Sequence, residues 1–274
     1  MPEHFTSFTA FFHQAGLRDL LISTVLFAAI WFAYKRTLQV DLQHLLTKTG
    51  VKTDLAYWLT NRLITNPLLI VGATFLFGTL LKFPILLPGL RELHLVVQVL
   101  IGSVIYDFFS YWRHRWSHHD LLWPVHAPHH SSTNLNWLSG VREHFLDIIL
   151  IALFGGILLA LLGFSLEAIA IIGIIRLYWI DFVHLDLPFS LGPLDYIITT
   201  PRFHRWHHVP RVPDMPGNRN FSGLFSFFDL AFGTFYLPKD KLPERFGAGE
   251  PNYPSGFWGQ LWQPFRMYAA RLKR

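Results

Sequence analysis

The chain of 274 residues contains no cysteine. A protein without thiols has neither a disulfide framework nor a thiolate-bound zinc or iron–sulfur site. Charge is also scarce, since Asp, Glu, Lys and Arg make up 15% of the residues, whereas soluble proteins average about 25%. Together with a mean hydropathy of +0.31, this composition argues against a soluble protein and favours an integral membrane protein.

The sequence also has little concentrated positive charge. Its formal net charge is +5, but the basic residues are spread over the segments between apolar runs, and no nucleic-acid-binding motif accompanies them. Nucleic acid is therefore not expected as a partner, whereas anionic headgroups of membrane lipids are. Ten tryptophans fit a protein with many indole rings at a lipid–water boundary. The ones expected there, or packed nearby, are Trp112, Trp116, Trp123, Trp137 and Trp206.

Long apolar runs are what the sequence has in place of charge. Crossing ~30 Å of hydrocarbon takes about 20 mostly apolar residues as a helix. The candidate runs cover residues 20–34, 63–81, 93–112, 148–166 and 168–183. We predict an all-α integral membrane protein with about four to five transmembrane helices, of which the last two form a tight antiparallel hairpin. The first run lacks the features of a cleaved signal peptide and is expected to remain as an anchor.

Basic residues indicate which side of the membrane each segment faces. If all five runs cross, residues 35–62, 113–144 and 184–274 share one side and carry 19 of the 23 Lys and Arg residues. The positive-inside rule makes this side cytoplasmic. We therefore expect N-terminal transmembrane helices over 1–92, a histidine-rich domain with a cytoplasmic helical cap over 93–237, and a cytoplasmic tail over 238–274.

Histidine is the residue that the sequence concentrates, with eleven of fifteen between positions 114 and 208. Three motifs have helical spacing, either i, i+4 or i, i+3, i+4, which brings the imidazoles of a motif to one helix face. Neutral imidazole is the commonest metal ligand, and eight imidazoles exceed what one tetrahedral ion uses. The spacing therefore favours two adjacent metal ions. The motifs are His114 and His118; His126, His129 and His130; and His204, His207 and His208.

Other histidines divide into candidate ligands and residues without a predicted role. His184 ends the fifth apolar run and His144 precedes the fourth, so both are expected to reach the same layer as the motifs. His119 points about 100° away from His118 on a helix and is expected in solvent or at the interface. Four isolated histidines carry no functional expectation: His4, His13, His44 and His94.

Asp107 is an ionisable residue inside an apolar run, where a charge is energetically expensive and therefore indicates a function. It lies two helical turns before His114, on the same face. We expect its carboxylate to orient an imidazole of the metal site. An ion pair with Arg176, inside the fifth run, is the alternative.

The motifs and their flanking residues resemble the fatty acid hydroxylase/sterol desaturase superfamily over about residues 100–237. The matching segments are DFFSYWRHRWSHH, LWPVHAPHHSSTNLNWLSGVREH, FVHLDLPFSLGPLDYIITTPRFHRWHH and FDLAFGTF. The resemblance implies a catalytic domain over 93–237 with two non-haem irons held by the eight motif histidines. His184 matches an additional family histidine, and His144 falls at the family's R-x-H position. The linker VPRVPDMPGNRN after the third motif departs from the family pattern by being compact.

The activity that the resemblance implies is hydroxylation of a C–H bond in a lipid or sterol-like substrate with dioxygen and external electrons. No fused haem carrier is recognisable, so a separate electron-donor protein is expected. Histidine does not select iron over zinc, and zinc can occupy such a site in purified protein. Desaturation by the same site stays an alternative. Two other classes of protein fit the sequence less well. A metal transporter would place its ligands near the bilayer midplane, whereas these histidines lie at the ends of the apolar runs and beyond. A zinc-dependent membrane hydrolase would use three ligands and often the motif H-E-x-x-H, which this sequence lacks.

Overall fold

The computed structural model describes residues 25, 29, 50–69, 71–72, 86–213 and 215–273. These residues are helical or irregular, with no β-strand among them, which confirms the all-α prediction for this part of the chain. The chain divides into two units, Met1–Leu45 and Leu46–Arg274, and every element below belongs to the second. The predicted run 20–34 lies outside the described residues except at two positions, and 63–81 is described only over 63–69 and 71–72.

Two of the described helices are long and apolar enough to cross a membrane. One is α5 (Leu95–Ser117). The other runs over residues 145–162 with a kink at Gly155, and consists of α7 (Phe145–Ala152), the π-helical η4 (Leu153–Ile157) and α8 (Leu158–Leu162). They correspond to the predicted runs 93–112 and 148–166. The fifth run forms α9 (Leu166–Val183), which contains three charged residues and does not meet the same criterion. The described residues thus support two of the predicted four to five spans.

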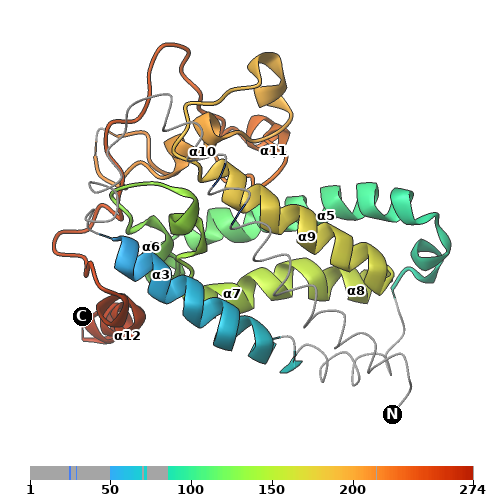
Figure 1. Ribbon diagram of the computed structural model, residues 1–274, viewed down its shortest axis with the longest axis horizontal. Helices are drawn as coiled ribbons and strands as arrows, with labels where there is room; N and C mark the ends of the chain where they lie inside the picture. The colour runs from blue at the N-terminus through green and yellow to red at the C-terminus, as the bar shows by residue number, and fades with distance from the viewer. Residues whose placement is uncertain are drawn as a thin grey trace. The chain divides into compact units, whose positions relative to one another are not determined.

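The α8–α9 connection forms the predicted tight hairpin (Figure 1). Gly163 ends α8 in the left-handed region with φ 108°, where a residue without Cβ is favoured. Ser165 begins α9 by accepting a hydrogen bond from the backbone N–H of Ala168. The returning helix packs on α5, where a Cβ at Gly102 would lie 2.6 Å from Cδ1 of Ile172. Glycine at this position therefore permits the close α5–α9 contact.

Short helices gather around the end of the bundle where α5 and α9 finish and α7 begins (Figure 1). We call these short helices the cap, and the cytoplasmic cap of the sequence analysis stays a prediction. In the cap, Trp123 is buried with Ala127 and Ala248 rather than at a surface, and Trp206 is also buried. The short elements at this end are α3 (Val51–Thr60), η1 (Asn61–Thr65), α6 (Trp123–His130), η3 (Trp137–Val141), η5 (Gly192–Tyr196), α10 (Pro201–His207), α11 (Phe227–Ala231) and α12 (Phe257–Leu272). The remaining short element, η2 (Pro88–Glu92), precedes α5 at the opposite end, where the backbone N–H of Leu87 donates to the carbonyl oxygen of Leu162.

Candidate metal centre

Nine of the predicted histidines form two groups at the cap end of the bundle, and all nine side chains are buried. Within each group, one ring nitrogen of every residue lies within 4.8 Å of those of all the others. The five-histidine group consists of His114, His118, His126, His130 and His207, and the four-histidine group consists of His129, His184, His204 and His208.

The second and third motifs each contribute to both groups. On α6, His126 and His130 belong to the five-histidine group, while His129 belongs to the other. Consecutive helical residues project about 100° apart, so His129 and His130 diverge toward separate centres on either side of His126. The third motif divides in the same way. The expectation that all three imidazoles of a motif share one face is therefore too coarse, because only the i, i+4 pairs stay together.

Backbone carbonyls fix the ring orientation of three of these histidines. A carbonyl oxygen only accepts hydrogen bonds, so a ring nitrogen bonded to it carries the proton and the opposite nitrogen presents a lone pair. In each of the three rings the protonated atom is Nδ1 and the free lone pair is on Nε2. The contacts join His114 to Phe221 at 2.7 Å, His207 to Arg219 at 2.9 Å, and His184 to Ile180 at 2.7 Å.

In the four-histidine group, the Nε2 atoms of His184, His204 and His208 lie 3.0–3.1 Å from one another. Nε2 of His184 presents a lone pair to this cluster, and a cation between the three Nε2 atoms would satisfy them together. Imidazoles bound at right angles to one ion through bonds of about 2.1 Å would have nitrogens about 3.0 Å apart. The spacing therefore fits a single transition-metal ion.

The five-histidine group has the same character. Nε2 of His126 lies 3.1 Å from Nε2 of His114 and 3.2 Å from Nε2 of His130. The Nε2 atoms of His118 and His207 are buried and have no hydrogen-bond partner among the described residues. A buried polar atom without a partner is costly, and a cation among these lone pairs would remove that cost. The donor set thus fits a second metal ion.

Burial keeps these imidazoles neutral, which is the form that binds metal. Removal from water disfavours the charged ring and holds the pKa of His118, His129 and His130 well below the usual range. The same cause lowers the pKa of His184 to about 4 and that of His207 to about 3. Neighbouring imidazoles add to the effect at most of these positions, because a second positive charge nearby is unfavourable.

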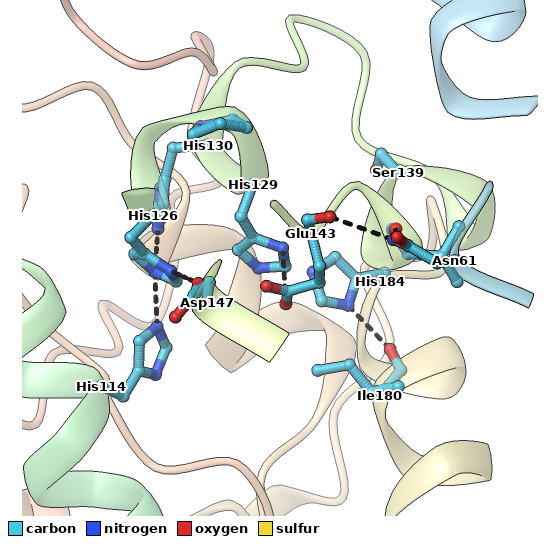
Figure 2. A network of polar contacts seen from close by, with 12 residues as sticks. Asn61, His114, His126, His129, His130, Ser139, Glu143, Asp147, Ile180 and His184 are labelled. Carbon is cyan, nitrogen blue, oxygen red and sulfur yellow. Dashed lines mark hydrogen bonds and ion pairs between the residues drawn. The ribbon is translucent and has the colours of Figure 1, made fainter. Parts of the chain in front are cut away.

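Two carboxylates that the sequence analysis did not single out contact the groups (Figure 2). Asp147 accepts a hydrogen bond of 2.6 Å from Nδ1 of His126 and one of 2.9 Å from Arg113. An oxygen of Glu143 lies 3.2 Å from Nδ1 of His129. One carboxylate thus orients a ring of the five-histidine group, and the other lies beside a ring of the four-histidine group. Two acidic residues spaced i, i+4 just before an apolar run were the sequence feature that could have identified them.

The end of the compact linker after the third motif, together with Phe221 next to it, supplies three of the histidines' partners. Residues 218–221 provide the Arg219 and Phe221 carbonyls described above, and Oδ1 of Asn218 lies 3.0 Å from Nδ1 of His118. Asn218 and Asn220 adopt left-handed φ values of 60° and 59°, which asparagine tolerates better than most residues. This segment therefore forms a wall that positions three histidines of the five-histidine group.

Asp107 does not contact a histidine in the described structure. Its buried carboxylate pairs with Arg176, the alternative that the sequence left open, and accepts hydrogen bonds from the backbone N–H groups of Leu224 at 3.0 Å and Phe225 at 2.7 Å. Orientation of an imidazole by a carboxylate is instead seen at Asp147. Asp107 therefore connects α5 to α9, through Arg176, and to the backbone of residues 224–225.

His144 lies apart from both groups. Its Nδ1 accepts a hydrogen bond from the backbone N–H of Leu146 and caps α7, while its Nε2 lies 3.1 Å from the carbonyl oxygen of Leu261. Both ring nitrogens are thus engaged with backbone, which differs from the expected ligand role. His119 is exposed, as predicted. The isolated His94 is exposed and caps α5.

All nine grouped histidines lie within a segment that matches a known family. Residues 99–234 match the family model described as fatty acid hydroxylase. The chain is 37% identical over 169 residues to ornithine lipid hydroxylase OlsE of Rhizobium tropici, which covers 61% of this chain and 50% of the relative. It is 33% identical over 138 residues to alkylglycerol monooxygenase of Xenopus tropicalis, covering 50% and 30%. It is 25% identical over 240 residues to the very-long-chain aldehyde decarbonylase GL1-7 of Oryza sativa subsp. japonica, covering 82% and 36%.

The chain spans half or less of the length of each of these relatives. No solved structure matches it.

Proposed function

Because residues 99–234 belong to the fatty acid hydroxylase family, we propose that this protein is a membrane-bound oxidoreductase that hydroxylates a C–H bond of a lipid with two iron ions. The observation that carries the proposal is the pair of buried all-histidine groups whose ring lone pairs converge. Bound iron would supply the redox chemistry that dioxygen activation and attack on an unactivated C–H bond require.

The chain's own residues have three roles in this proposal. The nine grouped histidines hold the metal ions, five at one centre and four at the other. Asp147, Asn218 and the carbonyls of Ile180, Arg219 and Phe221 keep five of the rings in the tautomer that offers a lone pair to the metal. These rings belong to His114, His118, His126, His184 and His207. The cap helices and the aromatic residues around Phe221 exclude water, because all nine rings are buried beneath them.

The proposed substrate is an amphiphilic membrane lipid with a long hydrocarbon chain. Two of the relatives are named for ornithine lipid and alkylglycerol, which share such chains but differ in headgroup. The groups lie at the end of α5 and near the start of α7, and the proposed route of the hydrocarbon chain is from the bilayer along these helices. Dioxygen and a separate electron-donor protein complete the reaction, which we place at the cytoplasmic face of a multi-pass protein.

The test combines metal analysis with product analysis on the detergent-purified full chain. After loading with ferrous iron and reduction, the protein should hold two irons and consume oxygen when a lipid extract is added. Mass spectrometry of the lipids should find products with one added oxygen atom. Loss of two hydrogens instead would identify desaturation by the same site. Tightly held zinc, no oxygen uptake and hydrolysed lipid would contradict the proposal.

Matched histidine variants separate the metal site from general folding. His207→Ala removes a ring of the five-histidine group and His129→Ala removes one of the four-histidine group, so each should abolish oxygen uptake and lower metal content while membrane insertion persists. His119→Ala is the control, because this exposed ring lies next to His118 in sequence but outside both groups. Full activity in either His129→Ala or His207→Ala would exclude the shared two-ion site.

A further inference from the structure

The helix α12 near the C-terminus turns an apolar face away from the rest of the described chain. Trp258 is 71% exposed, Trp262 is 56% exposed and Phe265 is 41% exposed. With 3.6 residues per turn, these side chains lie within an arc of about 60°. Gln260 and Pro264, on the nearly opposite face, are buried against the protein. The aromatic stripe is therefore a second face, and no described element covers it.

Contacts on the buried face hold α12 in a fixed orientation. Met267 packs against the Trp123 cluster of the cap, and the Tyr268 hydroxyl donates a hydrogen bond of 2.9 Å to the carbonyl oxygen of Leu121. The helix also contacts α3, where the rings of Phe257 and Tyr57 meet edge to face at 4.9 Å. An exposed stripe on a helix anchored in this way has a defined direction.

The helix α12 lies beside the start of the candidate membrane span over 145–162. The ring of His144 lies 3.1 Å from the Leu261 carbonyl oxygen and 6.0 Å from the ring of Phe265. His144 is the residue immediately before α7, which opens the apolar helix over 145–162. The stripe on α12 is thus next to the place where the chain would enter the bilayer.

The direction of α12 is also that of a helix lying in a membrane surface. In Figure 1 it is seen nearly end-on, whereas α5, α7 and α8 lie across the page. The helix therefore runs roughly perpendicular to the two helices that are long and apolar enough to span a membrane. A helix perpendicular to the spans and placed at their ends lies along the surface of the bilayer.

The charges of this helix fit an anionic surface. Residues 257–273 contain Arg266, Arg271 and Lys273 and no Asp or Glu. Arg266 and Lys273 are exposed and lie along one edge of the stripe, at about 60–80° from Trp258 around the helix. Long basic side chains at such positions extend toward headgroup phosphates, and tryptophan is favoured at the boundary. This combination is typical of helices that lie in a lipid interface.

We propose that α12 lies in the surface of an anionic lipid bilayer, with Trp258, Trp262 and Phe265 in the headgroup layer and Arg266 and Lys273 among the phosphates. This contact fixes the cap end of the bundle, and with it the two histidine groups, at the membrane surface. The proposal depends on the orientation of the spans and not on the chemistry of the metal site, so it stands or falls separately from the proposed function.

The absence of cysteine makes the test direct, because a single introduced thiol can be labelled uniquely. We would attach a nitroxide spin label at Trp262→Cys in the full chain, reconstituted in nanodiscs of phosphatidylcholine and phosphatidylglycerol. Its collision rates with lipid-soluble oxygen and with a water-soluble nickel chelate would then be compared. The matched control is Ala270→Cys, which is exposed on the same helix but about 80° from position 262 around it.

The label at position 262 should favour collisions with oxygen, and the label at position 270 should favour collisions with the nickel chelate. The preference for oxygen at position 262 should weaken in phosphatidylcholine alone and in an Arg266→Gln, Lys273→Gln background. A label at position 262 that is fully open to the nickel chelate would overturn the proposal. Shielding from both reagents would also overturn it, because the stripe would then be covered by a second copy or another protein.

Discussion

At the scale of single residues, Asp147 joins a metal-centre histidine to a buried arginine. Its two oxygens accept from His126 and Arg113, and its side chain is fully buried. In Asp147→Asn, an amide NH2 group replaces one carboxylate oxygen and cannot accept a hydrogen bond, and Arg113 loses its counter-charge. We expect destabilisation of about 3 kcal/mol and a loss of about 10- to 100-fold in the metal affinity of the five-histidine group. Thermal unfolding and competition with a chelator measure the two effects.

Glu143→Gln is the matched control for this prediction. Glu143 lies beside His129 of the other group and its side chain is 16% exposed, so water compensates for part of the lost contact. Burial and the nearby Asp147 carboxylate also raise the pKa of Glu143 well above its usual range. Glu143→Gln should therefore change the charge, and with it the metal affinity, less than Asp147→Asn does. A metal affinity in Asp147→Asn equal to that of the unmodified chain would exclude its orienting role.

The sequence predicted the grouped histidines because side-chain spacing on a helix is a local property. It did not predict the partners that hold them, since the carbonyls of Phe221, Arg219 and Ile180 belong to backbone and have no residue-type signal. Asp147 had such a signal, an acidic residue at the edge of an apolar run, but the predicted run began one residue later. The division of the histidines into two groups depends on how α6 packs against α10, where the ring of His130 lies beside those of His207 and His208. Spacing along the sequence does not predict that packing.

At the scale of elements, the Asp107–Arg176 pair connects α5 to α9 and to the backbone at residues 224–225. Replacing Arg176 leaves the fully buried Asp107 charged without its partner, and replacing Asp107 leaves Arg176, whose side chain is 17% exposed, without its counter-charge. We expect Arg176→Met to destabilise the fold by about 3–5 kcal/mol, and Asp107→Asn to do the same with additional weakening of two backbone hydrogen bonds. Thermal unfolding in detergent checks both.

The double variant Asp107→Asn, Arg176→Met completes the cycle. Because the two side chains interact, its destabilisation should be smaller than the sum of the single effects by about 1–3 kcal/mol. Additive losses would mean that the pair contributes nothing as a pair. Position 223 provides a further comparison, since a Cβ there would lie 2.3 Å from Nη2 of Arg176, and Gly223→Ala should therefore disturb the same junction.

Helix positions were predictable at this scale because apolar length is encoded continuously along the chain. The runs 93–112 and 148–166 became helices over 95–117 and 145–162, displaced by a few residues. The ends shifted because polar side chains there make specific contacts, as when His94 and His144 cap the helices that follow them. In α9 the apolar pattern was also correct, but the role of Arg176 as a partner of Asp107 depended on how α5 and α9 pack.

At the scale of the whole molecule, the cap encloses nine imidazoles in a volume that water does not reach. This arrangement makes the metal-free protein sensitive to acid. In the unfolded chain a histidine titrates near pH 6.5, whereas burial lowers the pKa of His184 to about 4 and that of His207 to about 3 in the folded protein. As the pH falls below about 6.5, protons bind the unfolded chain first.

The stability of the chelated protein should therefore be independent of these histidines above about pH 7 and should fall as the pH decreases from about 6.5 toward 4. Each buried imidazole contributes up to about 1.4 kcal/mol per pH unit in that window. Thermal unfolding of the chelator-treated full chain in detergent, at intervals from about pH 8 to about pH 5, measures the slope. The double variant His184→Gln, His207→Gln should show a shallower slope, since its replaced side chains do not titrate.

Metal loading should raise the unfolding temperature at neutral pH, because the ions bind the folded protein more tightly than the unfolded chain. The gain should shrink on acidification, since protons compete with metal for the same nitrogens. Equal unfolding temperatures of the chelated protein at about pH 8 and about pH 5 would show that the imidazoles are hydrated in the folded state. In that case the cap would be open to water, and the enclosed two-ion centre on which the proposed function depends would be wrong.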